Sequence, residues 1–300
     1  MEIEHILPVK FRKHFIHQKI DMDRLREIRF RIGQPVELFD GQYQLLCEEK
    51  VDRSDLKEML AYISGYSLYA FEEELSQGFI TIPGGHRVGV AGQVVVDHGY
   101  VKNIRNISFI NVRLSHEIIG CGTKVMPYLE GKGRLLNTLV ISPPGCGKTT
   151  LVRDIVRILS GHAGDPKGKN VTVVDERSEI AGCYCGMPQN DVGAHTDVLD
   201  GCPKSEGMMM AVRSLSPEII VVDEIGGKRD VQALQYVMNC GCAIIATVHG
   251  ESFQEIKDKP EVGELVEQEL FQRYILLKRS ERPGKICGIR DGKGRILYHG

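Results

Sequence analysis

The sequence lacks any apolar run that approaches the roughly 20 residues needed for a helix to cross a bilayer. Its longest apolar run, around residues 219–222, has the length of a β-strand. We therefore expect no direct membrane insertion, so that any role at a membrane would act through a partner protein.

An excess of charge is also lacking. The chain has 38 Lys and Arg residues against 40 Asp and Glu residues, a net charge of −2, and its basic residues are not interleaved with aromatic ones. A balanced charge gives no general reason to bind nucleic acid or an anionic membrane. We interpret the basic stretch at residues 10–31 as a solvated face and expect no nucleic-acid partner.

The nine cysteines are too sparse and irregular for a disulfide scaffold, and no secretory signal pattern opens the sequence. We therefore expect the reducing cytoplasm as the compartment. Cys183-x-Cys185 and Cys240-x-Cys242 have C-x-C spacing rather than the C-x-x-C that structural zinc sites favour. A metal site that includes these cysteines and Cys202 is a less favoured alternative.

A length of 300 residues favours two domains or one large one, and 42% hydrophobic with 26% charged residues is typical of a globular protein. Short β-patterned runs, a helical pattern at residues 54–64 with Ser54 as N-cap, and alternating runs from residue 79 onward predict a small α+β domain over residues 1–120. A glycine-rich stretch, residues 121–134, predicts a linker. Residues 135–300 then form an α/β domain that closes with a C-terminal hairpin.

The stretch that organises the second domain runs from residue 137 to 150, NTLVISPPGCGKTT. An apolar strand leads into a Gly-rich turn and then a helix, the arrangement of a phosphate-binding loop. Lys148 would reach the β- and γ-phosphates of a nucleotide, and the Thr149 hydroxyl would bind Mg²⁺. Ser142 stands where the full pattern has its first glycine. The residues expected to bind the nucleotide are Pro144, Gly145, Cys146, Gly147, Lys148, Thr149 and Thr150.

Further apolar strands end in polar residues: residues 171–174 in Asp175-Glu176, residues 219–222 in Asp223-Glu224, and residues 243–248 in His249. Strands that alternate with helices predict a parallel sheet, whose ligands bind beyond the carboxyl ends of the strands. Asp223 suits Mg²⁺ ligation and Glu224 suits the orientation of a water, with help from Glu176. His249 is a candidate γ-phosphate sensor. As an alternative, Asp175 and Glu176 are helix-capping or solvated loop acids.

These motifs resemble, in the same order, those of the secretion-type ATPases, the hexameric motors of type II and type IV secretion and of type IV pili. The matching segments are SPPGCGKTT at 142–150, VVDERSE at 173–179, IIVVDEIGG at 219–227 and ATVHG at 246–250. The resemblance implies a RecA-like P-loop domain, ATP and Mg²⁺ as cofactors, and a homo-hexamer with active sites between subunits. Arginines of the N-terminal domain would then reach the γ-phosphate of a neighbour, with Arg87 and Arg113 as candidates and Arg105 as a weaker one.

Within that family the sequence is most similar to a sporulation branch, through VVDERSEIAG and SPPGCGKTTLVRDI. This resemblance implies a cytoplasmic ATPase at the inner face of the mother-cell membrane, docked on the channel proteins of an export apparatus that leads to the forespore. Two alternatives stay open: a nucleic-acid translocase or helicase, and a nucleotide-gated assembly scaffold with little turnover.

Overall fold

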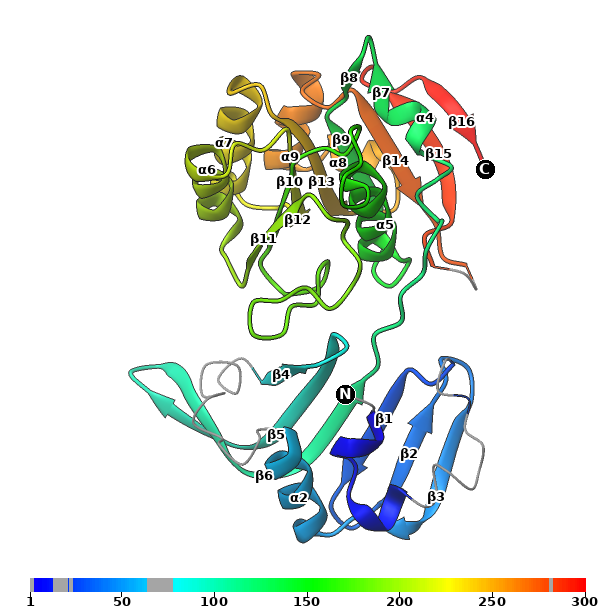
Figure 1. Ribbon diagram of the computed structural model, residues 1–300, viewed down its shortest axis with the longest axis vertical. Coiled ribbons are helices and arrows are strands. Elements are labelled where there is room, and N and C mark those ends of the chain that lie inside the picture. The colour runs from blue at the N-terminus through cyan, green and yellow to red at the C-terminus, as the bar shows by residue number, and fades with distance from the viewer. Residues whose placement is uncertain (1–2, 13–20, 22–23, 64–77, 281–282) are drawn as a thin grey trace. The chain divides into compact units, whose positions relative to one another are not determined.

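The computed structural model describes residues 3–12, 21, 24–63, 78–280 and 283–300 (Figure 1). The chain divides into two compact units, Met1–His116 and Glu117–Gly300. In the described part of the chain, no helix has the length and apolar character needed to span a membrane.

The first unit is built on an antiparallel six-stranded sheet in the order β3-β2-β1-β6-β5-β4. Apolar residues on one face of this sheet form a core with those of the helix α2 (Arg53–Ile63) and the short 3₁₀ helix η1 (Ile3–Ile6). The expected α+β organisation is thus confirmed. The strands are β1 (Glu27–Arg31), β2 (Pro35–Phe39), β3 (Gln44–Lys50), β4 (Phe79–Ile82), β5 (His86–Asp97) and β6 (Tyr100–Arg113).

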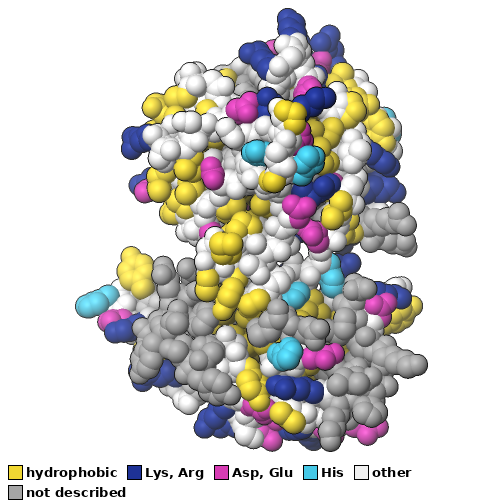
Figure 2. All heavy atoms as spheres, viewed as in Figure 1, with side chains coloured by type: hydrophobic (Ala, Val, Ile, Leu, Met, Phe, Trp, Pro, Cys, Tyr) yellow, Lys and Arg dark blue, Asp and Glu magenta, His cyan; other side chains and the backbone are white. Residues whose placement is uncertain are grey.

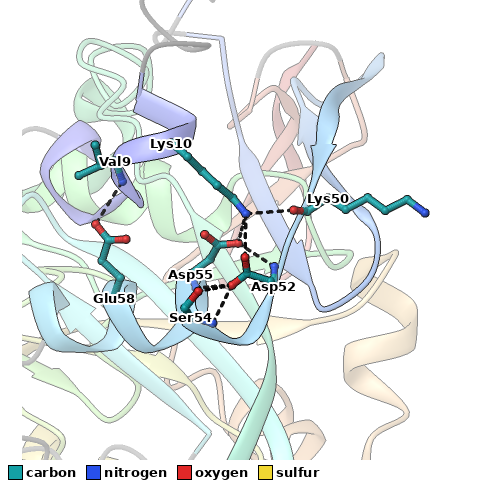
Figure 3. Close-up of polar contacts among 7 residues, drawn as sticks. All are labelled: Val9, Lys10, Lys50, Asp52, Ser54, Asp55 and Glu58. Carbon is teal, nitrogen blue, oxygen red and sulfur yellow. Dashed lines mark hydrogen bonds and ion pairs between the residues drawn. The ribbon is translucent and has the colours of Figure 1, made fainter.

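A polar cluster attaches the N-terminal segment to the start of α2 (Figure 3). The Lys10 ammonium lies 2.5 Å from Asp55 and 3.3 Å from Asp52. Asp52 Oδ1 accepts the backbone N–H of Ser54 at 2.7 Å and that of Asp55 at 3.1 Å. Asp52, rather than the predicted Ser54, therefore caps α2, because its carboxylate reaches the free N–H groups of the first turn.

The second unit contains an eight-stranded sheet in the order β11-β10-β12-β13-β9-β14-β15-β16. The first six strands in this order are parallel, and β15 and β16 are antiparallel additions at one edge. Every residue of β9 and β10 is buried, as expected for parallel strands covered on both faces. The strands are β9 (Thr138–Ser142), β10 (Val171–Asp175), β11 (Thr196–Asp200), β12 (Ile219–Glu224), β13 (Ala243–His249), β14 (Arg273–Leu277), β15 (Ile286–Asp291) and β16 (Ile296–His299).

Helices cover both faces of this sheet (Figure 1). Helix α5 (Lys148–Ser160) packs on one face with Val140 of β9, while Leu139 and Ile141 face the opposite core. That second core includes residues of α6 (Lys204–Ser214), α7 (Lys228–Asn239), α8 (Phe253–Lys257) and α9 (Pro260–Glu267). The predicted α/β class is confirmed. In Figure 2, acidic and basic side chains are interspersed over the visible face of this unit, consistent with the balanced charge.

Two further segments of the second unit were addressed by the sequence. The segment 121–134 contains the short helix α4 (Met126–Leu129) and the strand pair β7 (Glu130–Gly131) and β8 (Arg134–Leu135). Its side chains Val125 and Leu129 are fully buried in the core beside α5, so this glycine-rich stretch packs with the second unit. The expected C-terminal hairpin is β15–β16 at the sheet edge. Strand β14, for which no partner was expected, pairs in parallel with β9 inside the sheet.

Candidate functional site

The Gly-rich loop joins β9 to α5 with two glycines in the left-handed region. Gly145 has φ +74° and Gly147, the N-cap of α5, has φ +86°. A Cβ on Gly147 would lie 2.2 Å from the backbone N of Gly284, whose N–H donates to the Cys146 carbonyl at 2.8 Å. The loop is therefore held from behind by the β14–β15 connection, and only glycine fits at position 147.

Ser142, where the full phosphate-loop pattern has glycine, is the last residue of β9 and is completely buried. Its carbonyl oxygen lies 3.2 Å from His249 Nδ1 and accepts the Gly250 N–H at 3.2 Å. The serine thus continues the strand and holds the histidine at the end of β13.

Lys148, Glu224 and His249 meet at the carboxyl ends of β9, β12 and β13. Glu224 Oε2 lies 3.0 Å from His249 Nε2 and 3.8 Å from Lys148 Nζ. The Lys148 side chain is only 12% exposed. Burial lowers the pKa of Lys148, and the negative charges of Glu224 and Asp223 partly oppose that shift.

Asp175, at the end of β10, is completely buried and organises the loop that follows it. Its carboxylate accepts the N–H groups of Glu179 at 2.8 Å, Ile180 at 2.9 Å and Ala181 at 2.9 Å. Burial raises the pKa of Asp175 to about 6, although two of these hydrogen bonds lower it. Asp175 therefore holds a loop through its backbone N–H groups, and it neither caps a helix nor lies in solvent.

Arg153 of α5 was not predicted as a site residue. Its guanidinium binds backbone carbonyl groups of the same loop. Its guanidinium donates to the Ile180 carbonyl at 2.5 Å and to the Glu179 carbonyl at 2.7 Å. Arg153 is 8% exposed, and burial lowers its pKa. Asp175 and Arg153 together fix residues 175–181, which places Glu176 at the rim of the strand ends. Motif patterns carry no signal for Arg153, since its role depends on the packing of α5.

Glu176 contacts Lys204 of α6 and not the Lys148–Glu224 pair. The Lys204 ammonium is hydrogen-bonded to Glu176 Oε2 and lies 3.7 Å from Asp223 Oδ1. Lys204 was not predicted as a site residue. The one signal in the sequence is a lysine directly before an expected helix, a position where a cation is unfavourable.

The donors near the loop fit Mg²⁺. Asp223 is 8% exposed, and its Oδ1 has no hydrogen-bond partner among the described residues. Burial raises the pKa of Asp223, while the Lys204 charge lowers it. Thr149, the second residue of α5, supplies a hydroxyl. No cluster of three or more His, Cys, Asp or Glu side chains that would hold a metal was found in the described ranges. Mg²⁺ commonly takes only one or two carboxylates besides phosphate oxygens and waters.

The three candidate arginines lie in the first unit. Arg87 of β5 is directly opposite Arg113 of β6, and its guanidinium lies 4.8 Å from the ring centroid of Phe79. Arg113 is 64% exposed, with its Nε 3.9 Å from Glu27. Arg105 is exposed and paired with Gln93 in the outer part of the same hairpin.

Comparison with known sequences gives a consistent result over nearly the whole chain. A family model described as sporulation stage III, protein AA, matches residues 1–297. Stage III sporulation protein AA of Bacillus subtilis (strain 168) is 42% identical over 273 residues, which make up 91% of this chain and 89% of that protein.

Solved structures share the fold. The pilus retraction motor PilT, crystallised with bound ADP, aligns with a TM-score of 0.63 at 14% identity, over 95% of this chain and 82% of its own. The ATPase DotB of Legionella pneumophila aligns with a TM-score of 0.61 at 15% identity, over 90% of this chain and 76% of its own. The expected resemblance to secretion ATPases is thereby confirmed at the level of the fold.

Proposed function

This chain belongs to the sporulation stage III protein AA family, and on that premise we propose that it is an ATP-hydrolysing motor of the secretion type. The motor would act on a membrane channel or export apparatus during sporulation. The observation that carries the proposal is the convergence of Lys148, Glu224 and His249 with a Gly-rich loop at the carboxyl ends of parallel strands.

The proposed mechanism assigns each of these side chains one task. The loop N–H groups and Lys148 hold the β- and γ-phosphates, and Thr149 with Asp223 holds Mg²⁺. When bound, Mg²⁺ neutralises charge on the phosphate oxygens. Glu224 orients the attacking water and accepts its proton. His249, 3.0 Å from Glu224, positions that carboxylate and senses the γ-phosphate.

Lys148 and Glu224 form an ion pair, and in the proposed mechanism this pair has to open when a phosphate enters the loop. At 3.8 Å the contact is longer than a hydrogen bond, so separation of the two groups breaks no direct bond. Burial already disfavours the charged form of Lys148. A phosphate that enters the loop would give this ammonium a second anion at close range. Glu224 would then be free to contact the attacking water.

We further propose a homo-hexamer in which Arg87 and Arg113 of one subunit act at the site of its neighbour. Like charges directly opposite each other in a sheet are unfavourable. Arg87 and Arg113 occupy such opposite positions, with Glu27 3.9 Å from Arg113 Nε. A phosphate of the neighbouring subunit's nucleotide would be a further anion for this pair. Docking on channel proteins at the inner face of the mother-cell membrane is part of the same proposal.

Phosphate release from ATP by the concentrated, assembled protein tests this proposal. The wild-type chain should turn over ATP with Mg²⁺, and Lys148→Ala should abolish turnover. Lys169→Ala is the matched control, because Lys169 pairs with Glu218 near the opposite ends of the strands. Full activity in Lys148→Ala would reject the site. ATP binding without turnover in the wild type would favour the scaffold, and DNA-stimulated turnover would favour the translocase.

A further inference from the structure

Lys204 occupies a position that is unfavourable for a lysine. It is the first residue of α6, directly after Pro203, and its side chain is only 10% exposed. The amino end of a helix carries a partial positive charge, and a buried ammonium loses its hydration. Both effects oppose a cation here, so its retention requires nearby anions.

Two carboxylates from neighbouring strand ends supply those anions. Glu176 directly follows β10 and is hydrogen-bonded to the Lys204 ammonium, and Asp223 of the adjacent β12 lies 3.7 Å from it. Burial lowers the pKa of Lys204, but the Glu176 hydrogen bond and the charges of Asp223 and Glu176 outweigh it, so the net pKa is raised. Lys204 therefore remains an ammonium ion between two acids.

Asp223 depends on this ammonium. Its Oδ1 is buried and makes no hydrogen bond within the described part of the chain, and 3.7 Å is too long for one from Lys204. The charge of Lys204 therefore offsets the loss of hydration that burial imposes on this oxygen. A buried carboxylate oxygen without a hydrogen bond is a ligand that a hard divalent cation accepts.

We propose that Lys204 is the resident counterion of this carboxylate pair. Its ammonium offsets one of the two negative charges of Glu176 and Asp223, and it leaves Asp223 when a Mg²⁺–nucleotide complex binds. Lys204 is thus a positioning residue that lowers the net negative charge of the carboxylate pair and keeps the site folded between turnovers. This inference rests on the proposed function, since it takes Asp223 as the carboxylate that faces Mg²⁺.

The test measures thermal unfolding of the full chain without nucleotide, in EDTA and in MgCl₂. Lys204→Met removes the charge but keeps a long apolar side chain. In EDTA this variant should lose roughly 2–4 °C in Tm or more, and MgCl₂ should restore it because the unshielded carboxylates now bind the metal. The wild-type Tm should not respond to MgCl₂ alone.

Two further variants keep the result interpretable. Lys204→Met combined with Glu176→Gln should regain Tm in EDTA and lose most of the response to MgCl₂. Lys169→Met, which breaks the exposed Lys169–Glu218 pair, should show no response. Should Lys204→Met be insensitive to MgCl₂, or the wild type respond equally, the counterion role is refuted. Because no ATP is present, this outcome is independent of whether the protein hydrolyses ATP.

Discussion

His249 Nε2 lies 3.0 Å from Glu224 Oε2, while its Nδ1 lies 3.2 Å from the Ser142 carbonyl oxygen. The imidazole ring is thus held between a side-chain carboxyl group and a backbone carbonyl. The relationship ties the ends of β9, β12 and β13 to one carboxylate.

Glu224→Gln should lower ATP turnover by roughly 10²–10⁴-fold, because the amide cannot accept a proton from the attacking water. Nucleotide binding should persist, since Lys148 and the loop are unchanged. A time course of phosphate release measures turnover, and binding of a fluorescent nucleotide analogue measures affinity, so together they separate the two effects. If Glu224→Gln turns over ATP as fast as the wild type, Glu224 is not the group that activates water.

Gly147→Ala should destabilise the second unit and prevent nucleotide binding. The new Cβ would meet the backbone of Gly284 at 2.2 Å in a left-handed conformation. Gly145→Ala is the matched control, because its φ is also positive but no atom lies within 4 Å of the new Cβ. That control should cost only the conformational strain, roughly 1–2 kcal/mol. Urea unfolding would measure both losses of stability, and equal losses in the two variants would contradict the packing argument. Nucleotide binding is compared only between Gly147→Ala and the wild type, because Gly145 belongs to the same loop.

Asp175 should make stability depend on pH. Its pKa is raised to about 6 by burial, so between pH ~4 and ~6 the folded chain retains a proton that the unfolded chain has lost. The free energy of unfolding contributed by this group therefore falls as pH rises through that window, by about 3 kcal/mol at most.

Asp175→Asn should remove this component, so the stability difference between wild type and variant should shrink as pH rises from 4 to 7. Urea unfolding at several pH values measures it. Asp197→Asn, at an exposed position on β11, should run parallel to the wild type. Parallel curves for Asp175→Asn as well would show that Asp175 does not titrate in this range.

Arg113→Ala should reduce turnover without loss of fold, because the side chain is 64% exposed and its contact with Glu27 is long. Mixing Arg113→Ala with Lys148→Ala subunits should restore part of the activity, since mixed assemblies contain sites with an intact Lys148 and an intact neighbouring arginine. Arg105→Ala serves as the control and should stay near wild-type activity. Mixed assemblies that form but remain inactive would argue against arginines acting between subunits.

The sequence was sufficient to predict a feature where that feature requires a particular residue type within one short segment. Buried parallel strands require continuous apolar runs, which predicted β9, β10, β12 and β13, and the polar residues at their ends identified Lys148, Glu224 and His249. It missed β11 (Thr196–Asp200), whose residues are only partly buried at the sheet edge and show no apolar run. It also missed the insertion of β14 beside β9, because strand pairing over such a distance leaves no mark in either segment.

The sequence by itself determined the chemistry available at the strand ends: a glycine loop, a lysine, acids and a histidine, each adjacent to its own apolar run. Only the tertiary structure decided how these groups pair. Asp175 is buried and holds a loop, and Glu176 pairs with Lys204. Glu224 contacts Lys148 and His249. The physical reason is that electrostatic partners are selected by distances of a few ångströms, which the packing of α5 and α6 on the sheet sets and local sequence does not encode.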